Sequence, residues 1–258
     1  MTGLLQGKRG LVLGVANHHS IAWGITAAAA AQGARVALTY QNDVLKPRVE
    51  KLASTLTDTP LYECDVQNPA HIDSLAKNLK GDGLDFIVHS LAFASRQSLE
   101  SPFIETSEED FVQAMTISCY SLIALTRALA PIMNDGGSIL TLTYIGSRRV
   151  IPSYNLMGVA KAALEASVRY LAHDLGPRGI RVNAISAGTM RTLAASAIGG
   201  ARTTHKISND ATPLSRELTL DELGGAGVYL LSDLSTAVTG EVHSVDCGFH
   251  TVGLAHPG

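Results

Sequence analysis

Residues 11–40 read LVLGVANHHSIAWGITAAAAAQGARVALTY, and this stretch decides the fold. It opens with a short apolar run, Leu11 to Leu13, of the kind that forms a buried strand. An alanine-rich segment from about Ile21 to Gln32 follows and is ended by Gly33, which predicts a helix with a glycine stop. A second β-type run, Arg35 to Tyr40, closes the unit. The order strand, helix, strand predicts a βαβ unit, whose two strands lie parallel in one sheet.

The rest of the chain repeats this rhythm almost without interruption. Further strands are expected at Leu61 to Cys64, Leu84 to Ser90, Ser138 to Thr143, Arg181 to Ser186 and Glu241 to Val245. The helices expected between them run from about Val44 to Leu56, Ala70 to Leu79, Glu108 to Met133, Tyr154 to Leu175 and Leu220 to Leu231. Because crossover connections are right-handed, this order predicts an α/β fold with a doubly wound, Rossmann-type parallel sheet of about seven strands and helices on both faces. Ligands of such folds bind beyond the carboxyl ends of the strands.

Length and composition set the broad class of the protein. The chain has 258 residues, of which 46% are hydrophobic and 17% are charged, so a large core is expected and disorder is not. No repeat, low-complexity segment or linker interrupts it, and residues 1–258 are therefore expected to form a single domain. The net charge of −3 and the pI near 6.3 argue against a nucleic-acid partner, which needs a concentrated basic surface.

The cysteines and the apolar runs bear on where the protein works. Cys64, Cys119 and Cys247 lie far apart without a CxxC spacing, so no disulfide framework is expected and a reducing compartment fits best. No apolar run is expected to approach the roughly 20 residues that a membrane helix needs. Residues 1–10 have no apolar core of signal-peptide length. The sequence therefore predicts a soluble, cytoplasmic protein with no membrane contact.

The turn after the first strand is the place where a dinucleotide fold needs glycine, so that backbone N–H groups can approach a pyrophosphate. Here Gly14 and Gly24 are ten residues apart, which is not the GxGxxG pattern, and Ser20 is a plausible N-cap for the following helix. By itself the segment is typical of an ordinary strand-to-helix turn, whereas its position in the first βα unit favours cofactor binding. His18 and His19 have no third ligand at a suitable spacing, so no metal site is expected.

The end of the second strand predicts which nicotinamide cofactor is used. An acidic residue there usually binds the adenosine ribose, but this chain has Gln41, which can exchange hydrogen bonds with a ribose hydroxyl without a charge. No arginine adjoins Gln41 to favour a 2′-phosphate, so NADH is expected rather than NADPH. A polar turn without any ligand explains the same residues equally well.

Tyr144, Tyr154 and Lys161 are the candidate catalytic residues. Tyr154 and Lys161 are seven residues apart, two turns of a helix, and therefore lie on one face. Tyr144 lies just past the strand that ends at Thr143, at the edge where ligands bind. Hydride delivered to a carbonyl or a conjugated double bond creates an oxyanion, which a phenol can hold by a hydrogen bond while a nearby ammonium favours the negative charge. From the spacing alone, an amphipathic helix with a core tyrosine and a surface lysine is the simpler interpretation.

Taken together, these segments resemble the short-chain dehydrogenase/reductase superfamily and, within it, the bacterial NADH-dependent enoyl-[acyl-carrier-protein] reductases. The resemblance runs from end to end of the chain. The segments that carry it are Gly14 with Ser20 to Ala22, Thr39 to Asp43, Cys64 to Val66, His89 to Ala94, Tyr144 with Tyr154 to Lys161, Asn183 to Gly188, and Arg191 to Ser196. Each segment is modest alone, whereas the ordered set is specific.

The same resemblance separates this chain from relatives that reduce carbonyl groups. Those typically carry Tyr-x-x-x-Lys, with a serine thirteen residues before the tyrosine. Here Met157 stands four residues before Lys161, and Tyr144 stands thirteen residues before Met157. Tyr154 and Lys161, with six residues between them, replace the usual pair. This pattern indicates reduction of a carbon–carbon double bond.

The resemblance also implies a cofactor site for NADH. The residues expected along the cofactor are Gly14, Ser20, Ile21, Gln41, Asp65, Val66, Leu91, Lys161, Met190, Arg191, Thr192, Leu193 and Ala194. Among them, the carboxylate of Asp65 would take the exocyclic amine of adenine, and Lys161 would hold the nicotinamide ribose. Residues 190–194 would close over the nicotinamide and the pyrophosphate.

For the substrate, the resemblance implies an enoyl thioester on acyl carrier protein, reduced at its trans-2,3 double bond in fatty acid biosynthesis. Ala94 would line the substrate site, Tyr154 would stabilise the enolate at the thioester carbonyl, and Tyr144 would assist it. Two alternatives stay open: a short-chain reductase that acts on a carbonyl substrate, and a catalytically silent dinucleotide sensor. The sensor reading is disfavoured because the tyrosine and the lysine are both present.

The stretch from Gly188 to Pro213 is expected to be irregular and to act as a mobile, substrate-binding loop, because it is too long for an ordinary connection. Leu193 and Ile198 would form its apolar wall, and Arg202 and Lys206 would meet the acidic carrier protein. The family is typically tetrameric, so the resemblance implies a homotetramer, with residues 240–249 packed in an interface.

Overall fold

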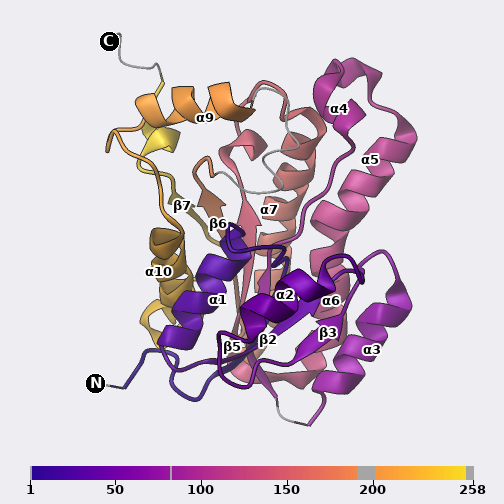
Figure 1. Cartoon of the computed structure of the whole chain (residues 1–258), viewed down its shortest axis with the longest axis vertical. Helices are drawn as coiled ribbons and strands as arrows, with labels where there is room; N and C mark the ends of the chain where they lie inside the picture. The colour runs from indigo at the N-terminus through magenta and orange to yellow at the C-terminus, as the bar shows by residue number, and fades with distance from the viewer. Residues whose placement is uncertain (1, 82, 191–200, 254–258) are drawn as a thin grey trace.

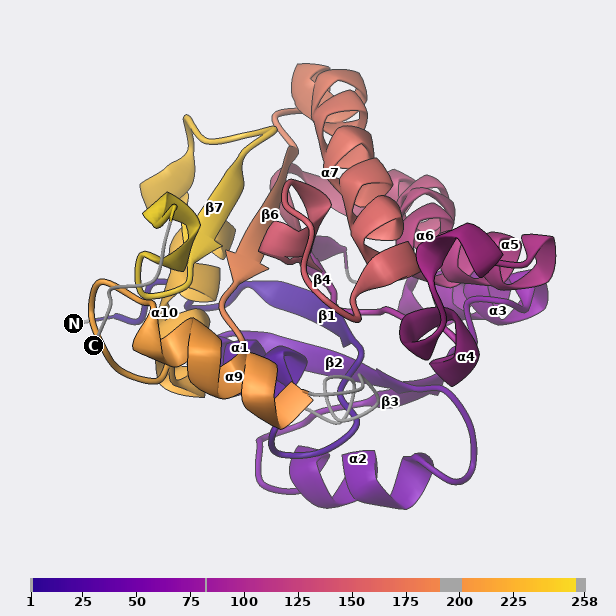
Figure 2. The same cartoon turned by 90° about the horizontal axis from the view of Figure 1, so that it is seen from above.

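One sheet of seven parallel strands organises the chain (Figures 1 and 2). The computed structural model describes residues 2–81, 83–190 and 201–253. The strands are, in chain order, β1 (Arg9–Leu13), β2 (Arg35–Tyr40), β3 (Leu61–Glu63), β4 (Leu84–His89), β5 (Met133–Thr143), β6 (Arg181–Ala187) and β7 (Val242–Val245). Across the sheet their order is β3-β2-β1-β4-β5-β6-β7, so the chain builds outward from β1 in one direction and, after β3, in the other. The doubly wound arrangement expected from the sequence is confirmed.

Helices cover both faces of the sheet, each face with its own hydrophobic core (Figure 2). The helices over one face are α1 (Ile21–Ala31), α2 (Lys46–Ala53) and α10 (Leu220–Leu231), and those over the other include α3 (Pro69–Leu79), α6 (Ser121–Leu129) and α7 (Asn155–Leu175). In β1, Leu11 and Leu13 belong to the core under α3, α6 and α7, whereas Val12 belongs to the other core. Alternate side chains of a strand point to opposite faces, so a strand covered on both faces reads as an unbroken apolar run.

The helical run between β4 and β5 extends from Glu108 to Ile132, as predicted, but it is not one α-helix. α5 (Glu108–Met115) passes through a π-helical turn, Thr116–Tyr120, into α6. A π turn inserts one residue into the helical repeat, so a 3.6-residue periodicity does not reveal it. The side chain of Ser107 caps the start of α5 by accepting the N–H of Asp110 over 3.1 Å.

The same run changes one expectation about membranes. The helical run 108–132 is long enough to cross a bilayer, and an 18-residue window within it has a mean hydropathy of 1.4, so the expectation that no apolar run approaches that length is wrong. Half of this apolar window is buried inside the structure, where Leu122, Leu125 and Leu129 belong to the core beside the sheet. A core helix passes the same test of length and hydropathy, so the run is weak evidence for a membrane span.

Three local predictions are corrected by the structure. Ala201–Asp210 forms helix α9, so the expected irregular stretch up to Pro213 is wrong for this part. Its sequence is almost entirely polar, so it has no apolar periodicity from which a helix could be predicted. The short helix α4 (Arg96–Glu100) was also missed, and β5 begins at Met133 rather than at Ser138.

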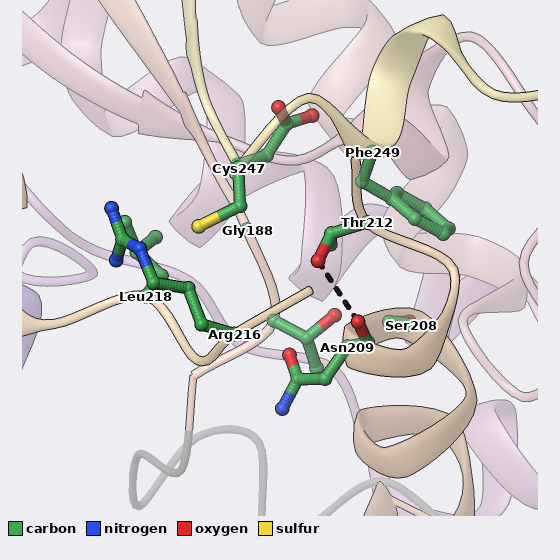
Figure 3. Close-up of a pocket in the computed structure, with 10 residues that line it drawn as sticks. Gly188, Ser208, Asn209, Thr212, Arg216, Leu218, Cys247 and Phe249 are labelled. Atoms are coloured by element: carbon green, nitrogen blue, oxygen red, sulfur yellow. Dashed lines mark hydrogen bonds between the residues drawn. The ribbon is translucent and has the colours of Figure 1, made fainter. Parts of the chain in front are cut away.

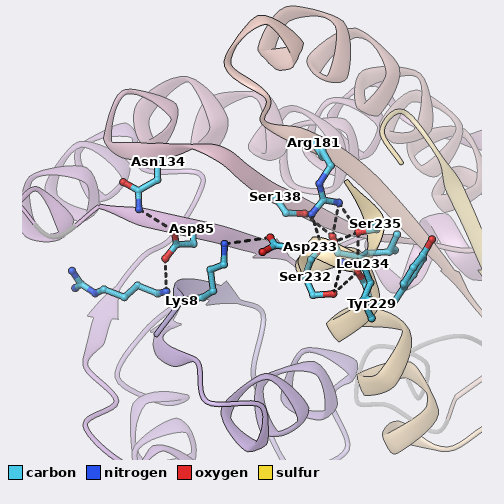
Figure 4. Close-up of polar contacts among 12 residues, drawn as sticks. Lys8, Asp85, Asn134, Ser138, Arg181, Tyr229, Ser232, Asp233, Leu234 and Ser235 are labelled. Atoms are coloured by element: carbon cyan, nitrogen blue, oxygen red, sulfur yellow. Dashed lines mark hydrogen bonds and ion pairs between the residues drawn. The ribbon is translucent and has the colours of Figure 1, made fainter. Parts of the chain in front are cut away.

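At the amino edge of the sheet, a polar network ties the end of α10 to the strands (Figure 4). Arg181, the first residue of β6, is buried and donates to Leu230 O and Ser235 Oγ, both over 2.8 Å, and to Ser232 O over 3.1 Å. Ser138 Oγ donates to the same Leu230 carbonyl over 2.9 Å. These contacts satisfy the buried guanidinium of Arg181 with groups of the protein itself.

Candidate active site

The predicted site residues gather at the carboxyl edge of the sheet. Parallel strands all end at the same edge, so residues that are far apart in the sequence meet there. The predicted site residues in the segments that follow the strands are Gly14 after β1, Gln41 after β2, Asp65 and Val66 after β3, Leu91 and Ala94 after β4, Tyr144 after β5, and Met190 after β6. Arg191, Thr192, Leu193 and Ala194 lie outside the described residues, as does Ile198.

Gly14 follows β1 beside the end of β4, the point where the winding direction of the sheet changes. Leu13 pairs with His89 at the ends of these strands, which brings Gly14 beside Ser90. Gly14 has φ +98°, and a Cβ on it would lie 2.0 Å from the carbonyl oxygen of Ser90. Only glycine fits this position without a backbone shift. In doubly wound sheets, dinucleotides bind beyond the strand ends at this point of reversal.

Ser20 holds the turn between β1 and α1 in place. It is the N-cap residue of α1, as predicted, but its Oγ accepts the N–H groups of Ala16 (3.0 Å) and Asn17 (3.1 Å) rather than one from the helix. Ser20 therefore fixes the turn, and Ile21 begins the helix directly behind it. The first turn of α1 holds no acidic side chain, so its positive end suits a pyrophosphate. The turn fits a dinucleotide cofactor.

The residues expected on the adenosine side lie at the ends of β2 and β3. Gln41 is exposed, in keeping with a residue that meets a ligand from solvent. Asp65 is half-buried, and its Oδ1 accepts the N–H of Gln67 over 3.0 Å, which fixes the carboxylate in place. Val66 packs against the core beside it. The ring centroids of His18 and His19 are 3.8 Å apart, with the rings tilted at 44° to each other, on the exposed turn. Within the described residues, no three His, Cys, Asp or Glu side chains gather as metal ligands.

Tyr144 and Tyr154 meet directly, as the sequence led us to expect. Their ring centroids are 4.9 Å apart and the rings lie at 70° to each other, edge to face. Tyr154 is buried at the N-cap of α7. Gly146 lies against the ring of Tyr154, because a Cβ at Gly146 would lie 2.4 Å from Tyr154 Cδ1. Gly146 was not among the predicted site residues, although a glycine two residues after Tyr144 was a usable signal.

The backbone around Tyr154 is strained on both sides. Ser153 has φ +60° and Asn155 has φ +35°, in the left-handed region that non-glycine residues rarely adopt. The Asn155 side chain holds this geometry, because its Nδ2 donates to Leu99 O (3.2 Å) and Ser101 O (2.9 Å). Asn155 therefore ties the segment that follows Ala94 to the start of α7, a role that the sequence analysis did not assign.

Lys161 is buried, so the simpler interpretation of a surface lysine is wrong. Its Nζ donates to Leu142 O over 2.7 Å, two residues before Tyr144. Burial lowers the pKa of Lys161 to about 8, and the nearby Cys119 and Glu165 oppose this effect. A lysine with such a pKa is still mostly an ammonium at neutral pH, and it can bind a ligand hydroxyl inside the site.

Both tyrosines keep their protons at neutral pH. Burial raises the pKa of Tyr154 strongly, and the neighbouring Tyr144 and Glu165 raise it further. Burial also raises the pKa of Tyr144, although its hydrogen bonds with the side chains of Thr189 and Ser208 oppose this effect and the charge of Asp246 adds to it. Two protonated phenols in contact are suited to donate hydrogen bonds to an oxygen on which negative charge develops.

Met157 stands at the position where the carbonyl-reducing relatives carry their catalytic tyrosine. Its side chain is packed among apolar neighbours. It is buried with Leu99 and Tyr154, and Ala94 packs against this cluster. Ser118, from the π turn, donates from its Oγ toward Met157 Sδ over 3.8 Å. The thioether has no proton to give, so the donors at this site are Tyr144 and Tyr154.

His89 is a residue of the site that the sequence analysis did not interpret. It is fully buried at the end of β4, with Nδ1 2.8 Å from Thr141 Oγ1 and Nε2 2.8 Å from Ser121 Oγ. Burial, together with the charge of Lys161, lowers its pKa to about 3, so the ring is neutral at physiological pH. Its contacts join β4, β5 and α6 behind Lys161 and make it a structural part of the site.

A small pocket lies beside the ends of β6 and β7 (Figure 3). Gly188 follows β6, Ser208 and Asn209 come from α9, and Cys247 and Phe249 follow β7. Asp246, which also lines this pocket, accepts the N–H groups of Gly248 (3.0 Å) and His250 (2.9 Å). α9 thus packs beside the strand ends, next to Tyr144.

Comparison with known proteins identifies the family. The family model described as "Enoyl-(Acyl carrier protein) reductase" matches residues 14–250. The chain belongs to this family. The match begins at Gly14, after β1, and extends over Tyr144, Tyr154 and Lys161.

Relatives in this family are similar over nearly the full chain. "Enoyl-[acyl-carrier-protein] reductase [NADH] 1" of Rhizobium meliloti is 54% identical over 255 residues, covering 98% of this chain and 94% of that protein. The crystal structure of the enoyl-(acyl-carrier-protein) reductase of Anaplasma phagocytophilum in complex with NAD is 46% identical, covers 100% of this chain and 97% of that chain, and has a TM-score of 0.94. The NADH enzyme of Aquifex aeolicus is 45% identical, with a TM-score of 0.95 and coverage of 98% and 100%.

Proposed function

We propose that this chain is an NADH-dependent enoyl-[acyl-carrier-protein] reductase, which saturates the trans-2,3 double bond of enoyl thioesters in the last reductive step of fatty-acid elongation. The observation that carries this proposal is the contact of Tyr144 with Tyr154, together with Met157 at the place of the carbonyl-reducing tyrosine. The relatives in Rhizobium meliloti and Aquifex aeolicus, both named as NADH enoyl-acyl-carrier-protein reductases, support it.

Tyr154 holds the reacting oxygen. When bound, NADH supplies a hydride for the β-carbon of the enoyl thioester. Negative charge then develops on the thioester oxygen, and the protonated Tyr154 donates a hydrogen bond to it. A proton then adds to the α-carbon, which restores the thioester carbonyl and completes the saturation of the double bond. Tyr144 packs edge to face on Tyr154 and keeps that ring in place. Ala94 and Tyr144 complete the substrate site around Tyr154.

Lys161 and the strand ends hold the cofactor. Lys161 binds the nicotinamide ribose through the hydrogen-bond donors that Leu142 O does not use. Gly14, Ser20 and Ile21 receive the pyrophosphate, and the remaining cofactor contacts are assigned to Gln41, Asp65, Val66, Leu91, Met190, Arg191, Thr192, Leu193 and Ala194. Gln41 makes NADH the preferred cofactor, because it offers no charge to a 2′-phosphate.

Substrate binding is assigned to residues 188–213 of a single domain; residues 191–200 lie outside the described residues, and α9 is the helical part of this segment. The partner is acyl carrier protein, which presents the enoyl chain, and Arg202 and Lys206 are assigned to its acidic surface. Arg202→Glu is expected to lower the rate with carrier-linked substrate and to spare the rate with coenzyme A-linked substrate. An unchanged rate with carrier-linked substrate would remove this assignment.

The enzyme works in the cytoplasm as a homotetramer. Phe111 and Val112 of α5 and Tyr120 of the π turn are exposed, and such an apolar surface favours association. β7 is an edge strand of the sheet, and residues 240–249 around it are assigned to a second interface. Sedimentation velocity is expected to give the mass of four chains, and a monomer mass would contradict the assembly.

One assay tests the activity itself. NADH oxidation is followed at 340 nm with a 2-enoyl thioester, with a ketone and without substrate. We expect oxidation with the enoyl thioester alone. Oxidation with the ketone would favour carbonyl reduction, and no oxidation with either substrate would favour a silent dinucleotide sensor.

A further inference from the structure

Glu165 is a buried acid to which the mechanism above assigns no role. It lies on α7 one turn beyond Lys161 and is only 5% exposed. A buried carboxylate costs free energy unless hydrogen-bond donors surround it. The groups that donate to Glu165 therefore indicate what this carboxylate holds in place.

Three donors from one short segment meet the Glu165 carboxylate. Thr143 Oγ1 donates to Oε1 over 2.8 Å, and Ser147 Oγ donates to the same oxygen over 2.5 Å. Arg148 Nε, on a half-exposed side chain, lies 3.3 Å from Oε2. Thr143 and Ser147 stand on either side of Tyr144. One carboxylate therefore fastens both flanks of this tyrosine to α7.

Lys161 adds another attachment between the same two segments. Its Nζ donates to Leu142 O, in the strand end that leads to Tyr144. Two successive turns of α7 thus hold the segment around Tyr144, and Tyr154 stands at the start of the same helix. The relative position of the two tyrosine rings is set through α7 as well as by their own contact at 4.9 Å.

We propose that Glu165 is a positioning residue for the reduction: its carboxylate anchors both flanks of Tyr144 to the helix that carries Tyr154 and Lys161. The inference rests on the proposed function, because the two tyrosines need this alignment only if Tyr154 holds the reacting oxygen. A misplacement of about 1 Å at a reacting centre can lower a rate by up to about 100-fold.

The charge of Glu165 supports the same role. Burial lowers the pKa of Lys161, and Glu165 opposes this effect, so the lysine stays an ammonium to a higher pH. Burial raises the pKa of Tyr154, and Glu165 raises it further, so the phenol keeps its proton. One carboxylate thus favours the protonation states that the two catalytic groups need.

Other titratable groups face this cluster from the elements packed on α7. His89 comes from the end of β4, and its pKa of about 3 keeps it neutral. Cys119 comes from the π turn, and Arg169, one turn further along α7, donates to the main-chain oxygen of Glu165 over 3.1 Å. These groups are unchanged in Glu165→Gln, so the difference between variant and wild type isolates the carboxylate.

Steady-state kinetics of Glu165→Gln test the proposal, with Asp174→Asn as the matched control. Asp174 is an exposed acid on the same helix and has no part in the site. At pH 6.5, we expect kcat of Glu165→Gln to fall about tenfold while the Kd of NADH stays within about twofold. The alkaline limb of kcat/KM is expected to move about one pH unit lower, because Lys161 loses its proton earlier. Asp174→Asn should match wild type in all three quantities.

Two further variants keep the test decisive if Glu165→Gln does not fold. Ser147→Ala and Thr143→Val each remove one donor and leave the carboxylate charged, so each should lower kcat about threefold without moving the alkaline limb. Wild-type kcat in folded Glu165→Gln, or in both single-donor variants, would overturn the proposal. Failure of wild type to reduce an enoyl thioester would instead contradict the proposed function.

Discussion

Two buried cations lie at opposite edges of the same sheet, and their surroundings differ. Arg181, at the amino edge, donates to Leu230 O, Ser232 O and Ser235 Oγ (Figure 4). Within the residues that the structure describes, Lys161 at the carboxyl edge has a single acceptor, Leu142 O, although an ammonium offers three donors. Burial lowers the pKa of both side chains.

This difference distinguishes a cation that supports the fold from one that serves a ligand. The amino edge satisfies its cation with carbonyl and hydroxyl groups of the protein. The carboxyl edge leaves donors unused, in a site where two protonated phenols are in contact. If this contrast is correct, substitutions at the carboxyl edge should change chemistry or cofactor binding, and substitutions at the amino edge should change stability.

The largest effect is expected for Tyr154→Phe. Removal of the hydroxyl takes away the hydrogen bond to the developing oxyanion, so kcat should fall about 100- to 1,000-fold. The phenol is not assigned to the cofactor, so the Kd of NADH, measured by fluorescence titration, should stay within about twofold. A kcat within threefold of wild type would show that Tyr154 is not the group that holds the oxyanion.

Lys161→Met and Arg181→Met form the matched pair that tests the comparison directly. Lys161→Met should raise the Kd of NADH about 30-fold, because the ribose loses its ammonium partner. Arg181→Met should lower the free energy of unfolding by about 3 kcal/mol, because buried carbonyls lose their donors, and should leave the Kd of NADH within about twofold. Urea unfolding and NADH titration measure both quantities. Weaker NADH binding in Arg181→Met, together with lower stability but unchanged NADH binding in Lys161→Met, would contradict the comparison.

Gly146→Ala should lower kcat about tenfold, since the new Cβ would lie 2.4 Å from Tyr154 Cδ1 and displace the ring. Gly176→Ala is the control, because a Cβ at Gly176 meets nothing within 4 Å. Wild-type kcat in Gly146→Ala would mean that the ring of Tyr154 tolerates displacement.

The smallest effect is that of pH on NADH binding. The pKa of Lys161 is about 8, so the ammonium that binds the ribose is lost as the pH rises through that value. The Kd of NADH should therefore rise about fourfold between pH 7 and pH 8.5. Folding responds in the opposite direction: the unfolded value of 10.5 is higher, so the stability contributed by Lys161 should rise with pH between about 8 and 10.5. A Kd that does not change in wild type would contradict the assigned ribose contact.

The sequence predicted the sheet, and it placed Tyr154 and Lys161 on one helix, because both features depend on local patterns. Strands such as Leu11 to Leu13 are buried on both faces and therefore read as apolar runs. Tyr154 and Lys161 share a helix, so their spacing alone places them on one face. The ends of parallel strands meet at one edge, which is why Gly14 and Tyr144 fall into the same site.

Other parts of the site depend on contacts between distant segments, which no local pattern records. Glu165 and Asn155 act through hydrogen bonds to segments that lie far away in the sequence. The burial of Lys161 follows from how α7 packs on β5, and the sequence pattern favoured a surface position. α9 was missed because its polar sequence has no apolar stripe.

The most direct test of the central claim follows the hydride itself. Deuterium-labelled NADH, in both C4 stereoisomers, is oxidised with a trans-2-enoyl thioester, and the product is examined by NMR. We predict that one of the two isomers leaves deuterium on the β-carbon of a saturated thioester, with a solvent proton on the α-carbon. Deuterium on a carbon that bears a hydroxyl group, or no transfer from either isomer, would contradict the assignment of this site to reduction of a carbon–carbon double bond.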